Sequence, residues 1–115
     1  MLSQKYRFHG RNSLNRAYRK GRTVRDPRIS LRYVYLANYN NFRVAVVVSR
    51  KVSKSAVVRN RIRRRIYEAV RLRAEQLRPG YELIFSVYSD DLAKLSPKEL
   101  EVLILSQLKQ AGVVD

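Results

Sequence analysis

Hydrophobic and polar positions divide the chain into segments with a period of two and segments that repeat every three or four residues. Residues 28–37 alternate apolar or aromatic side chains with polar ones, and residues 42–49 form an almost unbroken apolar run. Both patterns are typical of β-strands. The stretch NYNN at residues 38–41 suits a hairpin loop between them. The second strand is apolar on both faces, so we expect it to lie centrally in a sheet.

A helical pattern follows at residues 57–71. Steps of 100° per residue place its apolar side chains within about 120° of arc and polar ones on the opposite side. The apolar side carries Val58, Ile62, Ile66, Ala69 and Val70, and the opposite side carries Asn60, Arg64, Tyr67 and Arg71. We therefore predict an amphipathic helix, which Pro79 and Gly80 end.

Three further segments complete the expected order of elements. Residues 12–20 are predicted to form a short helix, residues 81–88 a third strand, and residues 96–112 a last helix. The last helix has Ser96 as its cap and Glu99 in position for a capping box.

The whole chain, residues 1–115, is expected to form a single domain. Its length suits one modest core of two layers, and it shows no internal repeat, low-complexity tract or flexible linker. The predicted fold class is α/β, as an α+β two-layer sandwich with the element order α-β-β-α-β-α.

Composition adds a strong asymmetry of charge. The formal net charge is +16, and residues 1–67 hold 19 of the 25 Lys and Arg residues but one of the 9 acidic residues. Such repulsion destabilises a compact chain unless a polyanion is its working partner, and nucleic acid is the commonest one. The chain has no cysteine, signal peptide or membrane-spanning run, which favours a cytoplasmic location.

The predicted helix at residues 57–71 concentrates this charge, with six arginines and one acid. Arg59 and Arg63 form a like-charged pair at i, i+4 spacing, where exposed helices usually mix signs. Arg61 and Arg65 form another. A solvated charged face is the alternative, but a phosphate backbone would turn this repulsion into attraction. Arginine also outnumbers lysine by 18 to 7, and its planar fork suits a closely fitted RNA.

Basic and hydroxyl side chains gather just before this helix. The strand-to-helix junction contains Arg50, Lys51 and Lys54 together with Ser49, Ser53 and Ser55. Backbone N–H groups at a helix start, with hydroxyls beside them, form a natural phosphate site. Ordinary capping by Ser53 or Ser55 explains the serines equally well.

Tyrosines supply a second candidate surface. Tyr33 and Tyr35 share one face of their strand with Leu31, and Tyr18 of the first helix can sit against that face. Aromatic side chains on a sheet stack unpaired bases. Packing at the boundary of the core is the alternative for each tyrosine.

Candidate catalytic groups are sparse. His9 is the sole histidine, and the adjacent Asp90 and Asp91 follow Ser89 in a pattern that suits a helix-entry turn. The four glycines are scattered, so no glycine-rich phosphate loop is present. We expect no catalytic residue, no metal site and no protein-bound cofactor.

Residues 49–71, SRKVSKSAVVRNRIRRRIYEAVR, resemble the protein subunit of bacterial ribonuclease P. The family carries a Ser-Lys-Lys-like strand end, an Ala-Val pair, an RNRIKR motif and a Glu that ends the run. Here these correspond to residues 49–51, 56–57 and 59–64, and to Glu68. The resemblance extends over nearly the whole chain in the same order of elements.

This resemblance implies a fold and a partner. The family fold is an α/β sandwich with a left-handed β-α-β crossover, an exception to the usual handedness. Its partner is a catalytic RNA that uses magnesium ions to remove the 5′ leader from precursor tRNA. The resemblance therefore implies that this chain is a non-catalytic, RNA-binding protein cofactor. The enzyme it would assist is a ribonucleoprotein that processes tRNA, an endonuclease with hydrolase activity.

The resemblance also assigns roles to particular residues. By position, Arg59, Asn60, Arg61, Arg63 and Arg64 contact the catalytic RNA, with Arg50, Lys51 and Lys54 nearby. The leader is held in a cleft between the first helix and the sheet, where Leu14 and Tyr18 replace two phenylalanines and Tyr33 and Tyr35 are further candidates.

The sequence departs from the family at several positions. Tyr67 stands where an arginine is usual, Ala45 and Ser53 stand at or near common glycines, and the third strand ends in Ser-Val-Tyr at residues 86–88 instead of Ala-Arg. Two alternatives stay open. One is a ribosomal or general RNA-binding protein without a processing role, and the other is an autonomous nuclease, which the poverty of histidine and paired acids disfavours.

Overall fold

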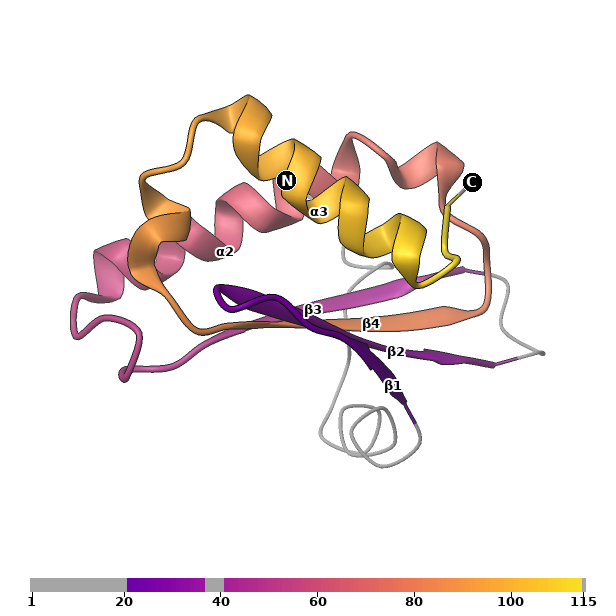
Figure 1. Cartoon of the computed structure of the whole chain (residues 1–115), viewed down its shortest axis with the longest axis horizontal. Coiled ribbons are helices and arrows are strands. Elements are labelled where there is room, and N and C mark those ends of the chain that lie inside the picture. Colours follow the sequence, from indigo (N-terminus) through magenta and orange to yellow (C-terminus); the bar gives the residue numbers. More distant parts are fainter. Residues whose placement is uncertain (1–20, 37–40, 115) are drawn as a thin grey trace.

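In the computed structural model, which describes residues 21–36 and 41–114, two α-helices cover one face of a four-stranded sheet (Figure 1). The elements are β1 (Arg22–Val24), β2 (Ile29–Tyr35), β3 (Arg43–Val48), α2 (Ala56–Arg71), η2 (Ala74–Gln76), β4 (Tyr81–Val87), η3 (Asp90–Ala93) and α3 (Pro97–Gln110), where η marks a short 3₁₀ helix. This arrangement confirms the predicted α+β fold class. The helix expected at residues 12–20 lies outside the described residues.

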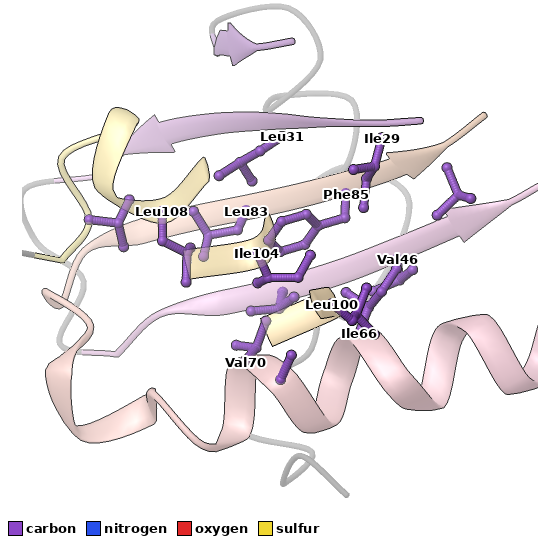
Figure 2. Packing of buried hydrophobic residues seen from close by; sticks show 14 of the residues in the cluster. Ile29, Leu31, Val46, Ile66, Val70, Leu83, Phe85, Leu100, Ile104 and Leu108 are labelled. Atoms are coloured by element: carbon purple, nitrogen blue, oxygen red, sulfur yellow. The ribbon is translucent and has the colours of Figure 1, made fainter. Parts of the chain in front are cut away.

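Alternate residues of the sheet and one stripe of each helix form the core (Figure 2). The sheet contributes Ile29, Leu31, Val44, Val46, Val48, Leu83, Phe85 and Val87, and the helices contribute Ile62, Ile66, Ala69, Val70, Leu100, Ile104 and Leu108. Burial of each large aliphatic or aromatic side chain stabilises the fold by about 1.5–3 kcal/mol. The apolar stripe predicted for α2 is therefore confirmed.

The sheet has the order β1-β2-β4-β3, which corrects the expected hairpin. Strand β4 lies between β2, its antiparallel neighbour, and β3, its parallel neighbour. The segment at residues 38–41 therefore joins two strands that do not pair. Strands β3 and β4 are instead joined through α2, as the expected β-α-β crossover requires; its left-handed sense stays a prediction.

Strand β3 lies at an edge of the sheet, so its predicted central position is wrong. The central strand on that side is β4, in which Glu82, Leu83, Ile84 and Phe85 are all fully buried. An apolar pattern reports burial of the two faces of a strand, and it does not report whether both edges are hydrogen-bonded. The pattern therefore could not distinguish the two strands.

Two local features were also missed. Strand β1 is only three residues long, RTV, and its polar composition carries no periodic signal. Helix α2 ends at Arg71, with Leu72 as its C-cap, well before Pro79. Gly80 has φ of +93° and lies where an added Cβ would come within 2.7 Å of the Tyr35 ring, so it serves the turn into β4.

Candidate nucleic-acid interface

Helix α2 presents two arginines directly to solvent. Its inward stripe, which includes Ile62 and Ile66, is fully buried against the sheet, so the opposite side of the helix must face outward. Arg61 and Arg64 on that side are exposed and form no hydrogen bond or ion pair with the described part of the chain. Their guanidinium groups are therefore available to an external anion.

Other predicted contacts on α2 are partly engaged within the protein. Arg59 donates from Nη1 to the carbonyl oxygen of Ser53 at 2.8 Å. Arg63 donates from Nη2 to Asn60 Oδ1 at 2.7 Å, and from Nη1 to the Val48 carbonyl at 3.5 Å. Because a guanidinium has five N–H donors, each arginine keeps donors for a phosphate while its side chain is held in place.

The junction before α2 contains serines that cap the helix and basic side chains that are exposed to solvent. The Ser55 hydroxyl accepts a hydrogen bond from Val58 N at 3.3 Å and caps the helix, and the Ser53 hydroxyl accepts one from Ser55 N at 3.2 Å. The capping interpretation of these serines is therefore confirmed.

The basic residues of this junction, Arg50, Lys51 and Lys54, are exposed, and none forms an ion pair with a described residue. The first turn of α2 contains no acidic residue. This helix start therefore keeps its positive potential. The predicted phosphate contact stays a prediction.

The two tyrosines of β2 differ in their surroundings. Both share the helix-covered face with Leu31, as predicted, and both contact Tyr81, with ring centroids 6.5 Å apart for Tyr33 and 5.2 Å apart for Tyr35. Tyr33 is half-buried and packs against the core, whereas Tyr35 is 58% exposed. Leu14 and Tyr18 lie outside the described residues, so the leader cleft stays a prediction.

A hollow that the sequence pattern did not indicate lies at the carboxyl ends of β3 and β4. It has a volume of about 370 Å³ and is lined by Val47, Ser49, Lys51, Val52, Ser86, Val87 and Tyr88. Tyr88 is 57% exposed, and its hydroxyl shares a hydrogen bond with Ser30 Oγ at 2.8 Å. An exposed aromatic ring thus lies beside a lysine and a serine of the junction. Tyr88 and the junction residues lie together because β3 and β4 pair in parallel, and the predicted hairpin did not include this pairing.

Tyr67 does not point outward as its place in the helical pattern suggested. It is half-buried at the core boundary, and its hydroxyl accepts a hydrogen bond from Val46 N at 3.3 Å. Tyr67 therefore satisfies a backbone group of the edge strand β3. The resemblance noted in the sequence places an arginine at this position, and in this chain the tyrosine found there serves the fold.

Acidic side chains near the interface are paired with arginine. Arg71 donates to Glu68 through Nε at 3.0 Å and 2.9 Å, and this hydrogen bonding lowers the pKa of Glu68. Glu68 therefore keeps its negative charge at neutral pH and offsets Arg71, which leaves the outward charge of α2 mainly to the arginines nearer its start.

Within residues 21–36 and 41–114, no group of three or more His, Cys, Asp or Glu residues could hold a metal ion. Among the same residues, no helix has the length and apolar character needed to cross a membrane.

Comparison with known proteins points to one family. A family model described as Ribonuclease P matches residues 2–112. The ribonuclease P protein component of Roseiflexus castenholzii is 35% identical, over 98% of this chain and 91% of its own length. The structure of the Staphylococcus aureus RNase P protein is similar with a TM-score of 0.83 at 23% identity, covering 96% of this chain and 98% of that one. The Thermotoga maritima RNase P protein has a TM-score of 0.79 at 18% identity, with 90% and 96% covered.

Proposed function

Because the chain belongs to the ribonuclease P protein family, we propose that it acts as the protein cofactor of a ribonucleoprotein whose RNA removes the 5′ leader from precursor tRNA. The observation that carries this proposal is that Arg61 and Arg64 are exposed and form no hydrogen bond or ion pair with the described residues, on the helix that follows the exposed basic residues 50, 51 and 54. The comparisons give no support to a ribosomal or general RNA-binding role.

The protein contributes binding energy and position, and the RNA performs the chemistry. Each phosphate that an arginine neutralises releases condensed counterions, so binding is expected to weaken by about 0.9 log units per contact for each log unit of salt. The described residues supply no cluster of metal ligands. In this proposal the magnesium ions belong to the RNA, where they would supply the metal chemistry of leader removal.

The hollow beside Tyr88 supports a second contact, with the leader. A single-stranded leader offers unpaired bases for stacking, and an exposed tyrosine provides a face for them. Lys51 and Ser49, which line the same hollow, can bind the adjoining phosphate. Because Lys51 also belongs to the junction that precedes α2, a leader in this hollow would run next to the catalytic RNA.

Reconstitution tests the proposed function. Purified protein is added to a bacterial ribonuclease P RNA and precursor tRNA at low magnesium concentration, in the cytoplasmic range of ionic strength. We expect faster leader removal with the protein, and a smaller effect with the double variant Arg61→Ala and Arg64→Ala. Lys109→Ala, which removes an exposed charge at the far end of α3, serves as the matched control. No stimulation by the unmodified protein would refute the proposal.

Co-purification separates the remaining alternatives. A ribosomal protein would stay bound to ribosomal subunits through a salt wash, whereas the proposed cofactor retains one long RNA. Cleavage by rigorously RNA-free protein would revive the autonomous nuclease.

A further inference from the structure

Arg65 differs from the other arginines of α2 in what it binds. Its Nη1 donates to the carbonyl oxygen of Leu92 at 2.7 Å, and its Nη2 donates to the carbonyl oxygen of Leu95. Both carbonyls belong to the segment that runs from η3 to Ser96, the N-cap of α3. Arg65 therefore connects α2 to the turn that introduces α3.

The two carbonyls are at the end of a short helix, where backbone acceptors lack partners within the helix. In this turn the backbone N–H groups of Lys94 and Leu95 both donate to the Asp91 carbonyl. Among the described residues, the Arg65 guanidinium is the only group that donates a hydrogen bond to the carbonyl oxygens of Leu92 and Leu95. The planar fork of arginine can satisfy two such acceptors at once, which a single lysine nitrogen does less well.

The electrostatic surroundings of Arg65 also distinguish it. The side chain is half-buried, and it has no ion pair with a described acid. Burial, followed by the positive charge of Arg61, lowers the pKa of Arg65. The charged guanidinium of Arg65 therefore lies at a position where partial burial disfavours its charge. Its hydrogen bonds to the Leu92 and Leu95 carbonyls offset this unfavourable free energy.

We propose that Arg65 is a positioning residue for RNA recognition: it fastens α2 to the turn before α3 and so fixes the direction in which Arg61 and Arg64 meet the RNA, without contacting RNA itself. This inference rests on the proposed function. An α-helix with its side chains has a radius of about 5–6 Å, so a rotation of about 10° moves the side-chain ends by about 1 Å. A shift of that size exceeds the spread in length of charge-assisted hydrogen bonds, about 2.7–2.9 Å.

Binding measurements at several salt concentrations test this role. Arg65→Met keeps most of the apolar stem and removes the charge, and Arg64→Met makes the same change at an RNA-facing position. Affinity for a bacterial ribonuclease P RNA is measured at a temperature where circular dichroism shows each variant to be folded. We expect Arg65→Met to weaken binding about tenfold with the salt slope of the unmodified protein. Arg64→Met should reduce the slope by about 0.9.

Arg65→Lys provides a second variant that keeps the charge. We expect its affinity to fall between those of Arg65→Met and the unmodified protein, again with an unchanged slope. The proposal is overturned if Arg65→Met reduces the slope as much as Arg64→Met, because Arg65 is then a phosphate contact. It is also overturned if Arg65→Met or Arg65→Lys binds as tightly as the unmodified protein. Failure of the unmodified protein to bind this RNA would instead refute the proposed function.

Discussion

The arginines of α2 carry the same charge but have different surroundings. Arg61 and Arg64 are exposed and unpaired within the described residues, whereas Arg59 is hydrogen-bonded to the Ser53 carbonyl. Sequence periodicity identifies which side of the helix each residue occupies, but it does not reveal a hydrogen bond to a carbonyl group outside the helix. Loss of charge should therefore have different consequences at these positions.

We predict that Arg64→Ala reduces the salt slope of RNA binding by about 0.9 and changes the free energy of unfolding by less than about 0.5 kcal/mol. Arg59→Ala should reduce the slope and also destabilise the fold by about 1 kcal/mol, since it removes an internal hydrogen bond. Filter binding at several salt concentrations and urea unfolding measure the two effects. An unchanged slope for Arg64→Ala would remove that residue from the interface.

Tyr88 is an exposed aromatic residue that lines the same hollow as Lys51, so its ring can stack a base there. We predict that Tyr88→Ala weakens binding of a precursor tRNA by about 1–3 kcal/mol and leaves binding of mature tRNA unchanged. Tyr88→Phe keeps the ring but loses the hydrogen bond with Ser30, and it should bind precursor nearly normally. Equal losses for precursor and mature tRNA would contradict the leader contact.

Some elements were predicted correctly and others were not, because some depend on neighbouring residues and others depend on residues far away in the sequence. The buried stripe of α2 and the start of α3 follow from local patterns, and the predicted capping box at Ser96 and Glu99 is confirmed, with hydrogen bonds of 3.1 Å and 3.2 Å. The neighbours of β3 depend on β4, more than 30 residues away. Nothing in the pattern of residues 42–49 specifies that long-range pairing, and the hollow at Tyr88 was missed for the same reason.

The capping box of α3 leads to a prediction on pH dependence. Hydrogen bonds from the Ser96 side chain and backbone lower the pKa of Glu99. Because the folded-state pKa is lowered, this contribution to stability is complete above the unfolded value of about 4.3 and is lost as the pH falls through the folded-state value. Glu99→Gln keeps an acceptor oxygen but does not titrate.

We therefore expect the unmodified protein to have the higher melting temperature at pH 7, and the difference from Glu99→Gln to shrink below about pH 4. Thermal unfolding followed by circular dichroism at both pH values measures it. A difference that stays constant over this range would show that the Glu99 carboxylate contributes nothing through its charge.

The molecule as a whole carries a net charge of +16, whereas residues 1–67 alone carry +18, since the remaining residues are net negative. The described fold offers little internal compensation there. Asp26 pairs with Arg28 and Glu82 pairs with Arg43, whereas Glu68 pairs with Arg71, which lies outside this segment. The same repulsion that favours RNA binding therefore opposes folding of the free protein.

This balance predicts that multivalent anions stabilise the protein more than salt alone. Simple screening depends on ionic strength, whereas an anion that binds only the folded state stabilises it by RT ln(1 + [L]/Kd), about 2.7 kcal/mol at 100 times its Kd. Pyrophosphate and sodium chloride are compared at equal ionic strength in thermal unfolding. We expect a higher melting temperature in pyrophosphate, and a smaller gain for the double variant Arg61→Ala and Arg64→Ala than for Lys109→Ala. Equal melting temperatures in the two salts would mean that the basic surface acts only as diffuse charge, without an anion site of its own.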